Sequence, residues 1–206
     1  MGVGDRLEFS YQHQWFDTGR AGARLGLGRG YTFEQDVFGA KLRLFGDVVA
    51  DQDRWWPQGS VGALHKRSAD GGVVRAVGAR DASGTDFYVA ATKLFLGEGL
   101  LVNGTVRFTR ANQFGLLGHG GDRENGYRAQ FEGSAAVLLT RTLALGGEFR
   151  TRPDNLRFAR EGSAFDLFGA WFINRHLSVV LAYVDLGRIA NQGRQNGVYL
   201  SLQAGF

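Results

Sequence analysis

Hydrophobic and polar residues alternate with a period of two along most of this chain. In an extended strand, this period places alternate side chains on opposite faces of a sheet. The last eleven residues, NGVYLSLQAGF, show it most clearly, because one face carries Val198, Leu200, Leu202, Ala204 and Phe206. Ten segments follow this pattern, and they cover residues 5–16, 38–44, 59–66, 87–96, 100–109, 127–137, 143–152, 165–173, 177–183 and 197–206. No segment shows a convincing helical period, so we predict an all-β chain.

The connections between these segments alternate in length. Every second connection is expected to be a tight turn, as at residues 97–99, 140–142 and 174–176. Within this short set, only GDVVADQDRWWP (46–57) is longer. The intervening connections are long, glycine-rich and charged, and they lie near residues 18–34, 68–84, 111–126, 153–163 and 187–196. Short turns at one end and long loops at the other are typical of an antiparallel meander in a bacterial outer-membrane barrel. We expect a single domain over residues 1–206, with the first and last segments pairing if this chain closes alone.

Alternation alone does not say which face is wet. A soluble lipid-binding barrel has apolar residues inside, whereas a membrane barrel has an apolar outer band and a polar lumen. Here the strands contain few Lys residues, and the apolar face ends in aromatic residues, as interfacial girdles do. These aromatic residues are Trp15, Phe45, Tyr127, Phe165, Tyr183 and Phe206. We therefore predict an antiparallel up-and-down transmembrane β-barrel of about ten strands, with the soluble lipid-binding barrel as the alternative.

The amino-acid composition argues against several classes of protein. Among 206 residues, 44% are hydrophobic, so a disordered chain is not expected, and no apolar run is long enough for a transmembrane helix. The absence of Cys excludes disulfides and thiolate metal sites. The net charge of +4 is spread along the chain, so we expect no nucleic-acid partner. The four His residues lack metal-ligand spacing, so we expect no metal or cofactor, and we interpret each as a surface or rim residue: His13, His65, His119 and His176.

Charged residues on the polar faces are the only candidates for a functional site. The set is predicted to line the lumen and comprises Lys41, Arg43, Lys66, Arg107, Arg128, Glu132, Glu148, Arg150, Arg152 and Asp166. One interpretation is a filled structural barrel in which these side chains neutralise one another. The other is a narrow channel for a small solute, with a preference for anions because basic residues are in excess. About eight strands give a filled barrel and sixteen or more an open one, so ten strands favour the filled form.

An enzymatic role belongs to a different class of function. Some small outer-membrane barrels hydrolyse lipid or peptide, and that chemistry needs a nucleophile beside a base. Ser60 and His65 are the nearest candidates, but the alternation gives them opposite faces. The GLGRG stretch (26–30) lacks the strand–turn–helix context of a phosphate loop, and we interpret it as a flexible outer loop. We therefore expect no catalytic residues, and keep a hydrolase as an alternative.

Three stretches resemble an uncharacterised family of proteobacterial outer-membrane proteins, described as a domain of unknown function. They are GLGRGYTFEQDVFGAKLRLFGD, GARDASGTDFYVAATKLFL and NGTVRFTRANQFGLLGHGGDR. The resemblance covers essentially the whole chain and implies a β-barrel in the outer membrane, without an assigned activity. It also implies a signal peptide and further strand-like segments before GDRLEFSYQ. This chain starts at that point without a signal peptide, which leaves open whether it is a shortened form of a larger barrel.

The terminal strand supplies the remaining expectations. Outer-membrane barrels commonly end on alternating apolar residues with a final aromatic, and VYLSLQAGF has this form. We predict that it is read by the barrel-assembly machinery and that it removes an exposed sheet edge by pairing. Phe206 is predicted to be a targeting and closure residue. The expected location is the outer membrane of a Gram-negative bacterium, with outer-membrane lipids, the assembly machinery and a small solute as partners.

Overall fold

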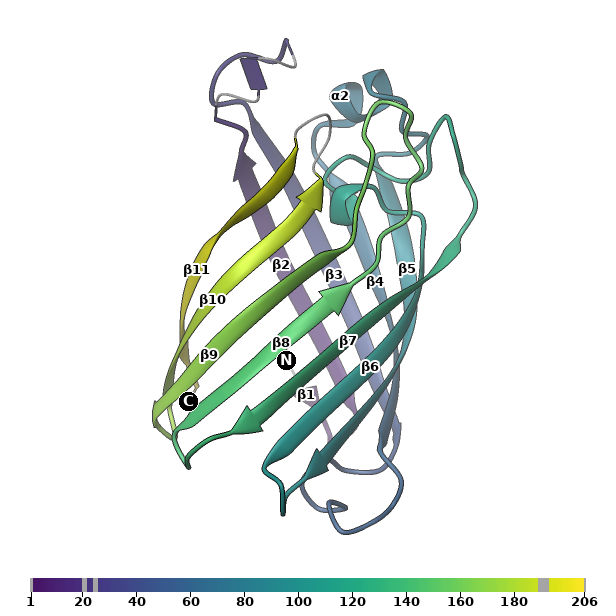
Figure 1. Cartoon of the computed structure of the whole chain (residues 1–206). Coiled ribbons are helices and arrows are strands. Elements are labelled where there is room, and N and C mark those ends of the chain that lie inside the picture. The colour runs from purple at the N-terminus through teal and green to yellow at the C-terminus, as the bar shows by residue number, and fades with distance from the viewer. Residues whose placement is uncertain (1, 20–21, 24–25, 189–192, 206) are drawn as a thin grey trace.

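The chain folds into one antiparallel sheet whose strands follow each other in sequence order (Figure 1). The computed structural model describes residues 2–19, 22–23, 26–188 and 193–205. The strands are β1 (Gly2–Val3), β2 (Leu7–Asp17), β3 (Thr32–Phe45), β4 (Gln58–Ser68), β5 (Ser83–Phe95), β6 (Leu100–Thr109), β7 (Arg128–Leu138), β8 (Leu143–Arg150), β9 (Ala164–Asn174), β10 (Leu177–Arg188) and β11 (Arg194–Ala204). All ten segments expected from the alternation are strands, which confirms the all-β class. β1 is additional, and two residues are too few for a visible period.

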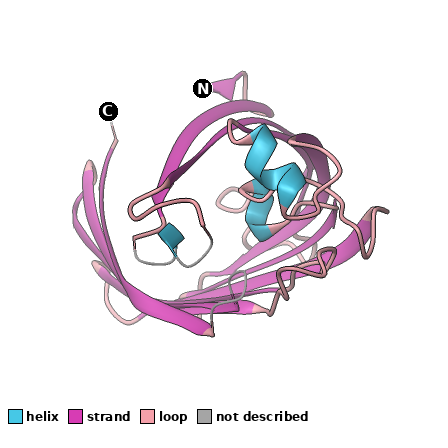
Figure 2. Cartoon of the chain, turned by 90° about the horizontal axis from the view of Figure 1, so that it is seen from above, coloured by secondary structure: helices cyan, strands magenta, loops and turns pink. Residues whose placement is uncertain are grey.

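The sheet curls like a barrel but is not closed. Seen from above, it forms an incomplete ring (Figure 2), and the strand order places β1 with β2 at one edge and β11 at the other. The first and last long strands are therefore at opposite ends of the strand order, as expected, but they do not pair among the described residues. β1 lies on the free edge of β2, where Val3 pairs with Leu7 and Gly2 with Glu8. Because β1 occupies part of the free edge of β2, β11 cannot pair with β2 along the whole length of that edge.

The two ends of the sheet differ in the way the sequence predicts. The turns between β5 and β6, β7 and β8, and β9 and β10 are short and lie together (Figure 1). The long connections lie at the opposite end, together with the helix α2 (Gly71–Ala76) and the short 3₁₀ turn η1 (Gln113–Gly115). A six-residue helix contains fewer than two turns, so its period is too short to detect in the sequence.

Large apolar side chains point away from the inside of the sheet over most of its height. Phe38, Phe87, Leu145, Leu181 and Leu202 are each at least 46% exposed on this outer face. The facing of the fourth segment, which is apolar on both sides, is settled by Phe87 and Val89, since both are exposed. Inward positions are instead polar, charged or small. The strands are thus apolar outside and polar inside, the reverse of a soluble barrel.

At the end of the sheet with the long loops, part of the outer face is polar and the inner face is apolar. There the outer face of β2, β3 and β4 carries His13, Asp36 and Arg67, which lie at matching register positions, and His13 Nδ1 is 2.9 Å from Asp36 Oδ1. The inner face has a small hydrophobic core under the loops, formed by Phe33, Val74, Ala79, Leu117, Leu156 and Ala159. β3 starts at Thr32, inside the stretch assigned to a loop, because its first inward residues pack against this core.

Candidate functional site

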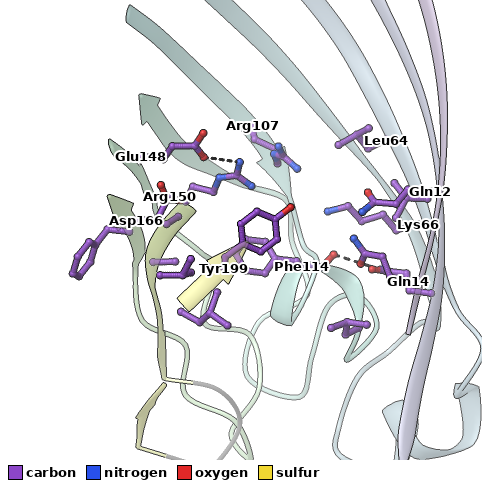
Figure 3. Close-up of a pocket in the computed structure, with 18 of the residues that line it drawn as sticks. Gln12, Gln14, Leu64, Lys66, Arg107, Phe114, Glu148, Arg150, Asp166 and Tyr199 are labelled. Carbon is purple, nitrogen blue, oxygen red and sulfur yellow. Dashed lines mark hydrogen bonds and ion pairs between the residues drawn. The ribbon is translucent and has the colours of Figure 1, made fainter. Parts of the chain in front are cut away.

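Residues from eight strands line one interior cavity of about 680 Å³. Figure 3 shows Gln12 of β2, Lys66 of β4 and Arg107 of β6 facing Arg150, Asp166 and Tyr199 across this space. Ladder pairing brings several of these residues together, because residues directly opposite in an antiparallel pair share a face. Glu148, for example, is the register partner of both Ser134 and Asp166. Half of the ten expected lumen charges therefore line this cavity.

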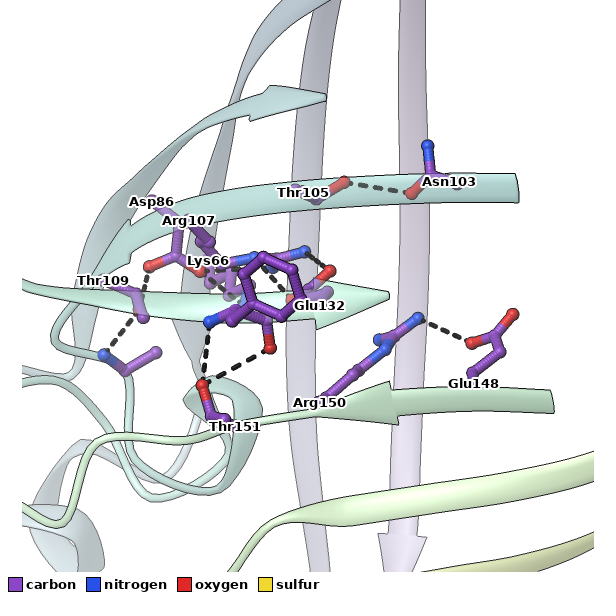
Figure 4. Close-up of polar contacts among 12 residues, drawn as sticks. Lys66, Asp86, Asn103, Thr105, Arg107, Thr109, Glu132, Glu148, Arg150 and Thr151 are labelled. Carbon is purple, nitrogen blue, oxygen red and sulfur yellow. Dashed lines mark hydrogen bonds and ion pairs between the residues drawn. The ribbon is translucent and has the colours of Figure 1, made fainter. Parts of the chain in front are cut away.

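A network of buried ion pairs fills one wall of this cavity (Figure 4). Lys66 Nζ lies 2.7 Å from Asp86 Oδ2, and Arg107 Nη1 lies 3.6 Å from the same oxygen. Arg107 also makes a two-pronged contact with Glu132, with Nε 2.9 Å from Oε1 and Nη2 3.0 Å from Oε2. Thr109 donates its hydroxyl to the second oxygen of Asp86. Two bases and two acids thus neutralise one another within hydrogen-bonding distance.

The sequence makes room for this network with small inward residues. Lys66 is the register partner of Gly84, and a Cβ at residue 84 would lie 2.4 Å from the ring of His119. Gly62, opposite Tyr88, is similarly crowded, since a Cβ there would lie 2.3 Å from the Tyr88 ring. A buried charge without a partner would cost several kcal/mol, so the close pairing explains why the sheet tolerates these residues inside.

The remaining expected lumen charges are distributed between the cavity and the two rims. Arg150 Nη2 donates to Glu148 Oε2 at 3.2 Å within the cavity. Lys41 lies 3.9 Å from Glu8, and both line a second cavity of about 460 Å³ near β1 that also includes Arg43. Arg128 is half exposed and pairs with Glu124 at 2.6 Å, so it belongs to the rim at the loop end.

Arg152 lies beyond the end of β8 and holds the long loops together. Its side chain is 3% exposed, with Nε donating to the Gly162 carbonyl at 2.8 Å and Nη1 donating to Gln113 Oε1 at 3.3 Å. Glu161 Oε2 lies 3.8 Å from Arg152 Nε. The other carboxylate oxygen of Glu161 accepts a hydrogen bond from the backbone N–H of Gln113. Burial raises the pKa of Glu161 to about 8 and lowers the pKa of Arg152. These contacts tie the loop after β8 to the loop after β6.

The interpretation of His119 as a surface or rim residue is wrong. It is completely buried, between Gly84 and the loop that contains it, and neither ring nitrogen has a hydrogen-bond partner among the described residues. Burial lowers its pKa from 6.5 to about 4. The loop folds back into the sheet: Asn112 donates to the carbonyls of Leu117 and Gly120, and Gln35 donates to the Phe114 carbonyl at 3.4 Å. We call residues 110–121 and 152–163 the cap.

The residues of the candidate hydrolase do not come together. Ser60 is buried on the inner face, whereas His65 is on the outer face and hydrogen-bonds to Thr85 at 3.0 Å. Within the described part of the chain, no group of three or more His, Cys, Asp or Glu side chains could hold a metal ion. None of the described helices is long and apolar enough to cross a membrane.

Comparison with known proteins identifies the family. Residues 1–203 match the model of the family described as "Protein of unknown function (DUF3034)". The chain belongs to this family. No curated protein and no solved structure matches it. The likeness to an uncharacterised family is therefore confirmed over nearly the whole DUF3034 chain.

The alternation of apolar and polar residues does not indicate the cap of this DUF3034 protein. Its composition does: residues 111–121, ANQFGLLGHGG, contain no Asp, Glu, Lys or Arg and include three large apolar residues. A long loop without charge is poorly suited to water, so burial is the expected outcome.

The apolar residues of the terminal strand lie on the outer face of the sheet. Val198, Leu200 and Leu202 are each at least 69% exposed on β11, and Ala204 ends the strand. Phe206 lies outside the described residues. The strand is anchored at its lower end, where the Gly205 amide donates to the His176 carbonyl at 2.9 Å.

Proposed function

We propose that this protein is a β-barrel protein of the outer membrane of a Gram-negative bacterium, with an interior filled by paired charges. The observation that carries the proposal is the combination of an exposed apolar outer face with the Lys66–Asp86–Arg107–Glu132 network inside. A membrane barrel needs an outer band that lipid can cover and an interior whose polar groups satisfy one another. The protein then serves as a structural barrel rather than a wide pore.

The inversion at the loop end supports a boundary between lipid and water. Apolar residues occupy the outer face at Phe38 and Phe87, whereas nearer the loop end the polar pair of His13 and Asp36 lies beside the exposed Trp15. Tyr11 donates its hydroxyl to Asp36 at 2.8 Å, so an aromatic side chain lies where the two zones meet. This is the placement that interfacial aromatic residues adopt in membranes. The loop end then projects into water and carries its own small core.

The partners in this proposal are outer-membrane lipids along the outer face and the barrel-assembly machinery at the terminal strand. The exposed Val198, Leu200 and Leu202 give that strand an unbroken apolar face. The proposal includes no enzymatic step, since Ser60 and His65 lie on opposite faces of β4.

A second candidate is a narrow channel that prefers anions. The observation in its favour is the set of bases around the charged cavity of about 680 Å³, where Lys66, Arg107 and Arg150 face Glu148 and Asp166. A surplus of bases in a narrow lumen selects anions. The cap lies over the cavity, since Phe114 and Leu116 form part of its wall, so any path for a small solute is constricted at the loop end.

Current recordings in planar bilayers test the proposal and separate the two candidates. For a filled barrel we expect inserted protein without resolved current steps. Small anion-selective steps favour the channel instead, and large unselective steps contradict both. A double variant, Arg107→Ser with Glu132→Ser, removes part of the network and should raise conductance. The matched control, Arg128→Ser with Glu124→Ser, removes an exposed rim pair and should leave it unchanged.

A further inference from the structure

A third cavity, of about 900 Å³, differs in chemistry from the charged cavity of about 680 Å³. It lies at the loop end, and its wall includes Phe16, Phe33, Val73, Val77, Leu116 and Leu186. These residues come from β2, β3, β10, the helix region of α2 and the cap. Among the described residues that line this cavity, none is charged. We call it the seam pocket, because its walls come from both sides of the unpaired seam between β2 and β11.

The seam pocket is reached from outside through that seam. Val198 and Tyr199 are consecutive residues of β11 and therefore point to opposite faces of the sheet, yet both line the pocket. Tyr199 faces inward with its register partner Ala182, which is buried, whereas Val198 is 76% exposed on the outer face. Because β11 ends the strand order, a cavity lined by both residues lies at the free edge of the sheet. The apolar interior is thus continuous with the apolar outer face.

We propose that the seam pocket binds the hydrocarbon chain of a single-chain amphiphile, such as a fatty acid, that enters from the bilayer between β2 and β11. The inference rests on the membrane location in the proposed function. The volume of the seam pocket is within the range of pockets that enclose small ligands, and an apolar wall with few polar groups suits a hydrocarbon.

The polar groups of the pocket indicate how the amphiphile is oriented. Thr18, Gln195 and Asn196 lie at the ends of β2 and β11 next to the long loops and supply hydroxyl and amide groups. Val184 and Tyr199 lie farther along their strands, toward the charged cavity, and line both cavities. We therefore expect the headgroup at the loop end and the hydrocarbon chain extending from it along the apolar wall, in contact with Phe16 and Leu186.

Two glycines in the wall allow the pocket to be filled without disturbing the backbone. A Cβ at Gly197 of β11 or at Gly72 of α2 would meet no atom of the described residues within 4 Å, and both glycines line the pocket. Gly197→Trp therefore fills the pocket from the strand side, and Gly72→Trp fills it from the helix side. Gly104 of β6 has the same open surroundings but belongs to neither cavity, so Gly104→Trp is the matched control.

Photo-crosslinking in vesicles tests the proposal. The protein is refolded into phosphatidylcholine vesicles that contain a small fraction of palmitic acid with a diazirine in its chain. After irradiation, labelled residues are identified by mass spectrometry. We expect label on the outer face and also on the peptide 111–123, whose Leu116 and Leu117 line the pocket from inside. Gly197→Trp and Gly72→Trp should each remove most of the label on this peptide, while Gly104→Trp should retain it.

The outcomes separate this inference from the proposed function. Heat-modifiable gel mobility of the vesicle fraction first reports whether the barrel has inserted, and a failure to insert overturns the proposed function and this inference together. Inserted protein with label confined to outward residues overturns the inference alone. Label on peptide 111–123 that persists equally in both pocket-filling variants also overturns it, because the probe would then reach the cap by another route.

Discussion

Lys66 Nζ lies 2.7 Å from Asp86 Oδ2, and both side chains are almost completely buried on the inner face of the sheet. Arg107 approaches the same carboxylate oxygen, so Asp86 has two cationic neighbours. Among the described residues, removing the carboxylate therefore leaves two buried bases with Glu132 as their acidic partner. This makes Asp86 the member of the network whose loss has the largest effect.

We expect Asp86→Ala to lower the free energy of unfolding by about 3–5 kcal/mol, because it breaks a buried pair by removing one partner. The double variant Asp86→Leu with Lys66→Met should cost less, since it removes both charges at once. Urea unfolding of the refolded protein measures both. Glu124→Ala, which breaks an exposed pair with Arg128, is the control and should cost less than about 1 kcal/mol. Equal losses for Asp86→Ala and Glu124→Ala would contradict the importance of the network.

Arginine substitutions test the assignment of the two faces. Val106 and Leu145 are exposed on the outer face, so Arg at either position should cost about 2–4 kcal/mol near the middle of the bilayer. Arg in place of Ser134 should cost much less, because Ser134 faces inward and is the register partner of Glu148. Folding titrations into lipid vesicles give the comparison. A similar cost at all three positions would refute the assigned facing.

His119 predicts a loss of stability in acid. Its pKa is about 4 in the folded protein, lower than the ordinary 6.5, because burial disfavours the charged ring. The stability that depends on a neutral His119 is fully present above pH 6.5, the pKa in the unfolded chain, and is lost as the pH falls through 4, the pKa in the folded protein. A difference of this size between the two pKa values corresponds to roughly 3 kcal/mol in the free energy of unfolding. His119→Leu keeps an apolar group in the same place and should flatten this part of the curve. The measurement is urea unfolding of both proteins at pH 7 and pH 4, and parallel losses would show that His119 does not contribute.

The terminal residue predicts an effect on assembly. Deleting Phe206, or replacing it with Asp, should lower the amount of folded protein in the outer membrane, because it shortens the alternating segment that the assembly machinery is proposed to read. Molecules that do assemble should behave normally in bilayers. Heat-modifiable mobility of membrane fractions reports the folded amount, and an unchanged yield would argue against this role.

The strands and their facing could be predicted because alternation is a local property of the sequence. Leu200 and Leu202 are two residues apart, and that spacing alone places them on one face. Most of the charges expected inside line the interior cavities for the same reason. Closure of the sheet could not be predicted, since it depends on which strand meets the free edge of β2, and the two residues of β1 are too short to leave a pattern.

The cap could not be predicted for a different reason. Contacts such as Asn155 with Asn112, which join residues 43 positions apart, depend on how two loops meet in space. His119 shows the consequence: its neighbours in the sequence are glycines, typical of an exposed turn, but Gly84 of β5 makes room for its ring. The seam pocket depends on the same loop packing. No periodic pattern in the sequence indicates it.

The central claim is that the apolar outer face of the sheet contacts lipid, and Trp171 of β9 tests it most directly. Trp171 is 55% exposed on the outer face and is the register partner of both Leu143 and Val179. With Trp15, Trp55 and Trp56 replaced by Phe, Trp171 becomes the only tryptophan of the chain. After refolding into vesicles whose lipids carry bromine in their acyl chains, its fluorescence should be strongly quenched relative to vesicles of unbrominated lipid. Unquenched fluorescence from protein that is folded and bound to the vesicles would contradict the account.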